Sequence, residues 1–174
     1  MNKQEYTIRN ARPNEHLKIG GLMVDVYSQL DGFPKENEQP GYYQMLKNIG
    51  ALTTNPETEL LVAVSAEDQI AGAVVYFSDM KYYGSGGTAT SEPNTAGFRF
   101  LAVDPLLRRQ GIGNLLVEEC IRRARETNLT QIIIHSTKSM QAAWKMYLNL
   151  GFKRSEDLDF MQGELPVFGF RLPF

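Results

Sequence analysis

The sequence is poor in the residues that build disulfides and most transition-metal sites. Its 174 residues include one cysteine, Cys120, and two histidines. A single cysteine cannot form an internal disulfide, and the cysteine and histidine side chains are too few for a zinc site built from them. We therefore expect a metal-free protein of a reducing compartment, the cytoplasm.

Long apolar runs and a strong excess of one charge sign are also missing. The N-terminus, MNKQEYTIRN, is polar, and no stretch of 18 apolar residues occurs, so neither an export signal nor a membrane span is indicated. With 18 basic and 20 acidic side chains, the formal charge is -2. Such a chain has no overall field to hold a polyanion, and we expect neither a membrane nor a nucleic acid as partner.

What the chain does have is the composition of an ordinary folded protein. Apolar residues make up 43% of it and charged residues 22%. A chain of this length is usually one domain and buries about 70% of the surface that it exposes when unfolded. We expect a single domain over residues 1–174.

Apolar periodicity and turn residues divide the first half of the chain into short elements. Residues 59–65 and 70–77 are apolar runs separated by AEDQ, which predicts a β-hairpin. A first strand at 6–9 and helices at 16–30 and 42–49 are expected before it. Between 78 and 97 glycine, serine, threonine and asparagine collect, which indicates a long loop.

The second half predicts a β-α-β unit, with strands at 98–103 and 131–136 and a helix at 111–127 between them. Such a crossover normally makes the two strands parallel. A second helix at 139–150 should end at Gly151, and two strands, 152–161 and 165–172, should close the chain.

Two glycines, Gly111 and Gly113, stand at the start of the crossover helix, where each costs about 0.5–1 kcal/mol relative to alanine. A helix N-terminus leaves backbone N–H groups unpaired and attracts anions, and glycine lets an anion approach them. The neighbouring Arg108 and Arg109 add positive charge. This pattern favours a phosphate site, although a tight strand-to-helix turn would also use such glycines.

The common nucleotide-binding motifs do not fit this loop. A Walker loop ends in Gly-Lys-Ser/Thr, whereas Asn114 follows Gly113 here. A dinucleotide fingerprint needs a third glycine where this chain has Leu116.

Two motifs instead resemble those of the GCN5-related N-acetyltransferase family. Residues 108–113, RRQGIG, which begin two residues after FLAVDP, are similar to the family's acetyl-CoA loop, [QR]-x-x-G-x-[GA]. Residues 142–152, AAWKMYLNLGF, are similar to its A-x-x-x-Y-x-x-x-G-F helix ending. The resemblance covers residues 98–152 well. It implies an α/β (α+β) fold, with a mixed, mostly antiparallel sheet, a central parallel β-α-β unit and helices on both faces.

The resemblance implies acetyl-CoA as cosubstrate, without a metal. The pantetheine arm would lie along main-chain atoms of Leu101, Ala102 and Val103, as in β-augmentation, and a backbone N–H there would stabilise the oxyanion of acyl transfer. The loop residues would bind the pyrophosphate: Arg108, Arg109, Gln110, Gly111, Ile112, Gly113 and Asn114. Met140 stands where the family commonly has an asparagine that contacts the cofactor.

Tyr147 and His135 are the catalytic candidates. By the resemblance, Tyr147 would donate a proton to the departing thiolate. The acceptor amine must lose a proton before it attacks, and His135 has a position similar to that of the base in some members. Glu92 and a water relay are alternatives, and a histidine at a strand end is more often structural. Direct attack on the thioester is expected, because Cys120 should be buried and no nucleophile motif occurs.

The sequence thus predicts a cytoplasmic N-acetyltransferase that acts on a primary amine of a small molecule or peptide. An acyl-CoA-binding regulatory module without catalysis is the alternative. A homodimer is compatible with the resemblance. By the resemblance, the acceptor pocket would be built from residues 26–43, with their aromatic and acidic side chains, the loop 78–97 and the last strands. Residues 26–43 could equally be a helix junction.

Overall fold

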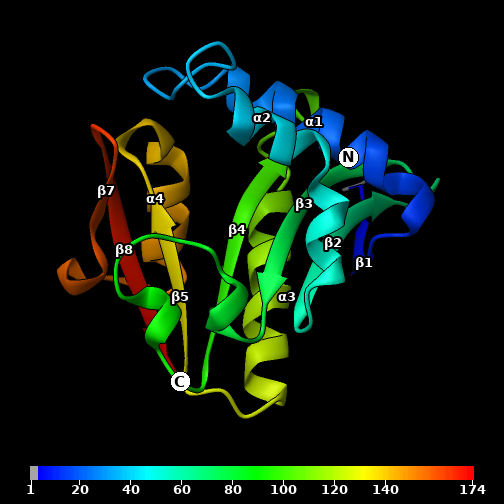
Figure 1. Ribbon diagram of the computed structural model, residues 1–174. Coiled ribbons are helices and arrows are strands. Elements are labelled where there is room, and N and C mark those ends of the chain that lie inside the picture. The colour runs from blue at the N-terminus through cyan, green and yellow to red at the C-terminus, as the bar shows by residue number, and fades with distance from the viewer. Residues whose placement is uncertain (1–3) are drawn as a thin grey trace. The chain divides into compact units, whose positions relative to one another are not determined.

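The computed structural model describes residues 4–174 (Figure 1). Its strands are β1 (Tyr6–Asn10), β2 (Thr58–Ser65), β3 (Ile70–Phe77), β4 (Thr95–Val103), β5 (Gln131–Ser136), β6 (Lys153–Arg154), β7 (Phe160–Gln162) and β8 (Leu165–Pro173). Its α-helices are α1 (His16–Ser28), α2 (Pro40–Lys47), α3 (Ile112–Glu126) and α4 (Gln141–Asn149).

The strands form a mixed, mostly antiparallel sheet. Hydrogen-bonded neighbours follow the order β1-β2-β3-β4-β5-β8-β6, and β7 pairs with β8 outside this order. β4 and β5 are parallel, while β1 with β2 and β5 with β8 are antiparallel. The predicted fold class, with a parallel β-α-β unit built from β4, α3 and β5, is confirmed.

Contacts divide the chain into two compact units, which we describe separately. The first unit contains the described residues up to Val75 together with Phe100–Glu119, and the second contains Tyr76–Arg99 and Cys120–Phe174. The assignment of residues 1–174 to one domain stays a prediction. None of the helices within residues 4–174 has the length and apolar character of a membrane span.

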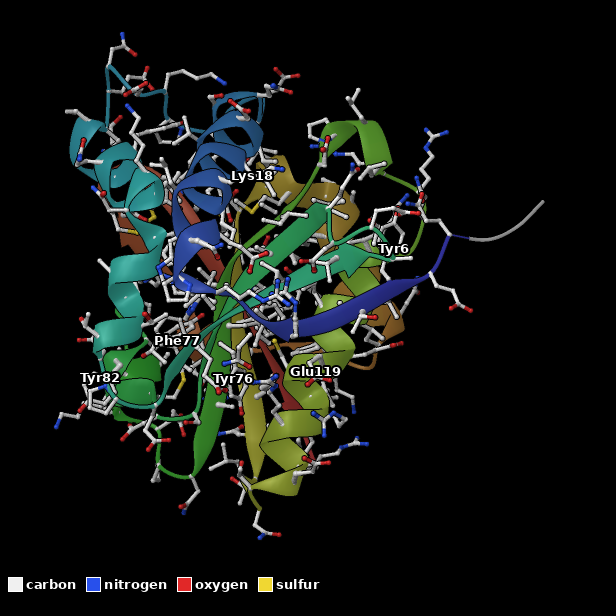
Figure 2. The ribbon with its side chains drawn as sticks, turned by 90° about the vertical axis from the view of Figure 1, so that its right-hand side faces the viewer. Tyr6, Lys18, Tyr76, Phe77, Tyr82 and Glu119 are labelled. Atoms are coloured by element: carbon white, nitrogen blue, oxygen red, sulfur yellow. The ribbon has the colours of Figure 1, made fainter. Side chains whose placement is uncertain are left out.

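The first unit packs helices on both faces of its strands. α1 and α2 lie on one face and the start of α3 on the other (Figures 1 and 2). Gly72 in β3 permits a close approach of α3, since a Cβ there would come within 3.1 Å of the Ile112 side chain. Ile112, Leu116 and Val117 at the start of α3 are buried.

The second unit centres on β5 and β8. Their register runs from Gln131 opposite Pro173 to Ser136 opposite Phe168. The segment before β4 was expected to be a long loop, but it contains two 3-10 turns, Met80–Tyr82 and Ala89–Ser91. These turns form because Met80, Tyr83 and Ala89 are buried.

The strand predicted over residues 152–161 divides into β6, a 3-10 turn at Glu156–Leu158 and β7. The turn buries Leu158 completely against Gly169, where an added Cβ would come within 2.3 Å of the Leu158 Cβ. Arg154 and Asp159 flank the turn and form an ion pair at 2.8 Å. Burial of one leucine and this ion pair therefore outweigh the continuous strand expected from the sequence.

Candidate functional site

The loop between β4 and α3 has the irregular backbone that the glycine pattern suggests. Asp104 caps a 3-10 turn, Pro105–Leu107, by accepting a hydrogen bond from the Leu106 N–H at 2.9 Å. Arg109 and Gly111 then adopt left-handed conformations, with φ of 66° and 78°. A Cβ at Gly111 would meet no atom within 4 Å, so the turn needs glycine here for its φ and not for lack of space.

The start of α3 presents unpaired donors. The first bond into the helix runs from the Leu115 N–H to the Gly111 carbonyl at 3.1 Å, and within residues 4–174 the N–H groups of residues 108–114 donate to no backbone carbonyl. Arg108, Arg109 and Asn114 are exposed beside them. The Gln110 side chain, unlike these exposed side chains, has a protein partner in the part of the chain that the structure describes: its oxygen accepts a hydrogen bond from the Tyr6 hydroxyl at 2.8 Å. The arrangement can bind an anion such as a phosphate.

The end of β4 carries a backbone irregularity that the sequence does not reveal. Phe100 adopts a left-handed conformation with φ of 59°, which is rare for a bulky residue and costs about 1–3 kcal/mol. Phe100 is nevertheless buried, and its ring lies 6.1 Å from that of Tyr42. Immediately after it come Leu101, Ala102 and Val103, the residues predicted to bind through their main chain.

The parallel pairing of β4 and β5 is short. It runs from Thr95 opposite Gln131 to Gly97 opposite Ile133. This register includes neither Phe98 nor the residues that follow it in β4. The pairing of β4 with β5 therefore ends before the carboxyl end of β4.

Tyr147 lies on α4 in the second unit and is 5% exposed. The rings of Phe98, Phe152 and Phe170 surround it at centroid distances of 5.8, 5.8 and 6.2 Å. No hydrogen bond joins its hydroxyl to another residue of the described chain. Burial, with smaller contributions from Tyr83 and Cys120, raises the pKa of Tyr147, so the phenol keeps its proton and can act as a donor.

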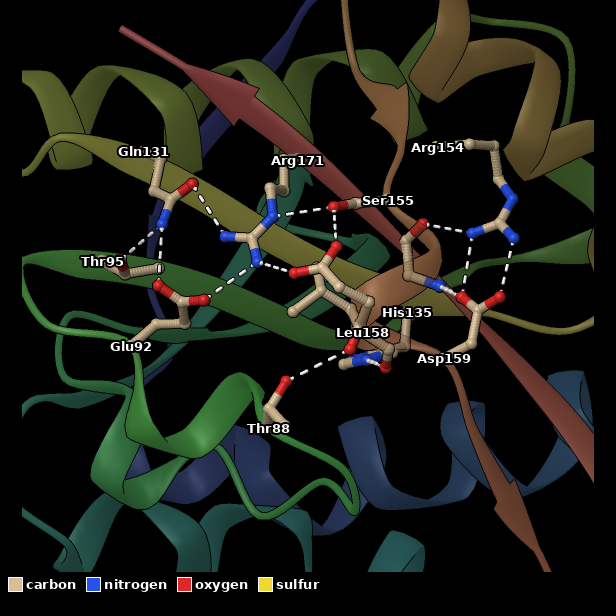
Figure 3. A network of polar contacts seen from close by, with 12 residues as sticks. Thr88, Glu92, Thr95, Gln131, His135, Arg154, Ser155, Leu158, Asp159 and Arg171 are labelled. Atoms are coloured by element: carbon tan, nitrogen blue, oxygen red, sulfur yellow. Dashed lines mark hydrogen bonds and ion pairs between the residues drawn. The ribbon is translucent and has the colours of Figure 1, made fainter.

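His135, at the end of β5, uses both ring nitrogens in contacts with protein atoms. Nε2 lies 2.9 Å from the Leu158 carbonyl oxygen, as Figure 3 shows, and Nδ1 lies 2.9 Å from the Tyr83 hydroxyl. Since a carbonyl can only accept, we infer that Nε2 carries the hydrogen and that Tyr83 donates to Nδ1. Burial lowers the pKa of His135. These contacts favour the structural alternative over the role of base, which stays a prediction.

The lowered pKa of His135 predicts a pH-dependent stability. Below its ordinary pKa of about 6.5 the unfolded chain binds a proton that the folded protein resists, so stability is lost as the pH falls below that value. Denaturant unfolding between pH 8 and 5 should show the wild type losing up to about 1.4 kcal/mol per pH unit more than His135→Gln, which cannot titrate there. Parallel stability curves for the two proteins would contradict this.

Glu92, the weaker candidate for the base, is part of a polar network (Figure 3). Its carboxylate pairs with Arg171 at 2.9 Å and accepts a hydrogen bond from Gln131 at 3.4 Å. Arg171 also pairs with Asp157 and donates to Ser155. Arg171 and Gln131 both contact the Glu92 carboxylate, so this network favours a structural role for Glu92.

The aromatic side chains of residues 26–43 pack on one another in the first unit. Tyr42 lies within 6.2 Å of the rings of Tyr27, Phe33 and Tyr43. The Tyr43 hydroxyl donates to the Pro34 carbonyl at 2.7 Å. The nearby acidic groups have local partners: Glu36 pairs with Lys47, and Glu38 accepts from the Lys35 N–H. These contacts fit the helix-junction interpretation.

The predicted site residues thus fall into two groups. Leu101, Ala102 and Val103 and the loop 108–114 lie in the first unit, while Tyr147, His135 and Glu92 lie in the second. The sequence did not single out Phe100, whose conformation depends on tertiary packing.

Comparisons with known proteins agree on one family. The model described as "Acetyltransferase (GNAT) family" matches residues 23–152. No curated protein matches the chain.

Solved structures similar to this chain share its fold at low sequence identity. A GNAT-family acetyltransferase from Staphylococcus aureus Mu50 is 16% identical with a TM-score of 0.73, covering 97% of this chain and 99% of that one. A PaiA N-acetyltransferase from Thermoplasma acidophilum, in complex with coenzyme A, is 13% identical with a TM-score of 0.74, covering 98% and 99%. The ribosomal-protein-S18-alanine N-acetyltransferase from Escherichia coli is 16% identical with a TM-score of 0.64, covering 97% and 94%.

Proposed function

Because this chain belongs to the acetyltransferase (GNAT) family, we propose that it transfers an acetyl group from acetyl-CoA directly to a primary amine of a small molecule or peptide. The observation that carries the proposal is the loop before α3, with its left-handed Gly111 and its unpaired N–H groups. Bound there, acetyl-CoA would supply an activated thioester.

The loop residues suit a pyrophosphate in charge and geometry. The free N–H groups of residues 108–114 and the positive end of the helix dipole both favour an anion. Arg108 and Arg109 are exposed beside the loop and add positive charge there. The Tyr6 hydroxyl holds Gln110, which limits the freedom of the loop. Leu101, Ala102 and Val103 would contact the pantetheine arm through their backbone.

The buried position of the cysteine supports direct acetyl transfer, without a covalent acyl-enzyme intermediate. Cys120, the single cysteine of the chain, is fully buried on α3. A buried thiol in apolar surroundings has neither the access nor the thiolate character that a nucleophile needs. The amine itself would therefore attack the thioester, and Tyr147 would protonate the departing sulfur.

The proton lost by the amine has three candidate acceptors, His135, Glu92 and water. His135 has no free ring nitrogen and Glu92 is paired with Arg171. These contacts favour a water relay.

The acceptor is proposed only as a class. The similar proteins named above include enzymes whose names specify N-acetylation, one of them on a ribosomal-protein alanine. A small amine or a peptide N-terminus is therefore the first acceptor to test.

Two measurements together distinguish this proposal from the alternative, an acyl-CoA-binding module without catalysis. Calorimetry should give coenzyme A binding, and a thiol-release assay over small amines and short peptides should give turnover. Binding with turnover supports the proposal. Binding without turnover on a broad panel favours the silent module, and no binding contradicts both.

A further inference from the structure

The last residue of β5, Ser136, carries a buried hydroxyl group. Ser136 is 3% exposed, and its Oγ has no hydrogen-bond partner within residues 4–174. A buried hydroxyl without a partner destabilises the folded protein, so such a group usually meets a ligand or an ordered water.

The polar groups of the residues that follow Ser136 have hydrogen-bond partners. The Thr137 and Ser139 hydroxyls bond each other at 2.7 Å. The Thr137 carbonyl accepts from the Trp144 indole N–H at 2.9 Å. Ser136 is therefore the exception in a segment that otherwise satisfies its polar atoms.

The pairing with β8 shows which way Ser136 faces. Directly opposed residues of two antiparallel strands point to the same face, and Ser136 is opposite Phe168. The Phe168 ring contacts Trp144 of α4 at 5.4 Å. Phe170, two residues along β8, contacts Trp144 and Tyr147. Ser136 thus lies on the face covered by α4, opposite to the face of His135.

Its position along the strand is also informative. Ser136 is the last residue of β5, three residues after the parallel pairing with β4 ends at Ile133. Ligands of α/β sheets bind beyond the carboxyl ends of parallel strands. Four residues later Met140 offers no polar group where an amide side chain was expected from the family resemblance.

We propose that the Ser136 hydroxyl forms a hydrogen bond with an amide of the pantetheine arm of the acyl donor. A neutral hydroxyl can donate to an amide carbonyl or accept from an amide N–H, and both groups occur along that arm. The inference rests on the proposed function, and it assigns to Ser136 a contact that Met140 cannot make.

The test compares Ser136→Ala with Thr58→Val, which removes another buried hydroxyl without a partner from the start of β2. Calorimetry would give the affinity for coenzyme A, and displacement would give that for pantetheine, which lacks the nucleotide. Ser136→Ala should lower both affinities by the same factor, about 3- to 10-fold, or ~0.7–1.4 kcal/mol. Thr58→Val should change neither.

Thermal unfolding of the free protein supplies a readout independent of binding. Because Ser136 Oγ bonds no protein atom, Ser136→Ala should keep or raise the melting temperature. Wild-type affinity in Ser136→Ala, or a marked fall in its melting temperature, would overturn the inference. If the wild type itself fails to bind coenzyme A, the proposed function fails with it. Normal wild-type binding with an unaffected variant removes only the role of Ser136, whose neighbour would then be water.

Discussion

Replacing Gly113 with valine is expected to weaken coenzyme A binding by about tenfold or more, which is roughly 1.4 kcal/mol. Gly113 is the second residue of α3 and half-buried, next to the unpaired N–H groups of the first turn. A phosphate oxygen must come within about 2.9 Å of these nitrogens to bond them. The two methyl groups of valine would block the phosphate sterically from these N–H groups.

The fold should tolerate the change, because valine has a somewhat better helix propensity than glycine. Gly21→Val is the matched control, since Gly21 lies in α1 and an added Cβ there meets no atom within 4 Å. It should leave the affinity unchanged and should keep or slightly raise the melting temperature. Unaltered coenzyme A affinity in a folded Gly113→Val protein would show that the glycine serves only the turn. Pantetheine, which lacks the pyrophosphate, should bind Gly113→Val as it binds the wild type.

The β-α-β unit could be predicted because its signals are local. An apolar stripe at helical spacing lies between two short, mostly apolar runs, and β5 and α3 lie within a residue of their predicted bounds. The irregular backbone of the loop could be predicted for the same reason, because Gly111 and Gly113 mark a turn into the helix, while its role as a phosphate site stays a prediction.

Features that depend on distant contacts could not be predicted. Nothing in the sequence near Phe100 favours a left-handed backbone, and packing on Tyr42 accompanies it. The turn at Glu156–Leu158 likewise depends on the buried position of Leu158 beside Gly169. Sequence places His135 at a strand end but cannot show that Tyr83 and Leu158 occupy its two nitrogens.

Tyr147→Phe should lower kcat by about 10- to 100-fold, because it removes the proposed proton donor to the departing thiolate. The variant keeps the ring, and with it the packing on Phe98, Phe152 and Phe170. Only the hydroxyl is lost, and that hydroxyl bonds no residue of the described chain. The melting temperature and the coenzyme A affinity should therefore change little.

Tyr83→Phe provides the contrast within the same unit. Its hydroxyl does have a protein partner, His135 Nδ1 at 2.9 Å, so this variant should lower the melting temperature without the same loss of kcat. If Tyr147→Phe lowers kcat without loss of stability, and Tyr83→Phe lowers stability without the same loss of kcat, the Tyr147 hydroxyl acts in the chemical step.

The raised pKa of Tyr147 adds a prediction about pH. A thiol has a pKa of about 8.5 and an ordinary phenol about 10, so a phenol whose pKa burial raises further is a weak acid toward the thiolate. Its proton would move only as the C–S bond breaks, and the phenol would stay protonated while the acceptor amine titrates near pH 10. The ratio of wild-type to Tyr147→Phe kcat should thus be constant between about pH 7 and 10. A kcat unchanged by the substitution, with chemistry rate-limiting, would leave solvent as the proton donor and Tyr147 as a core aromatic.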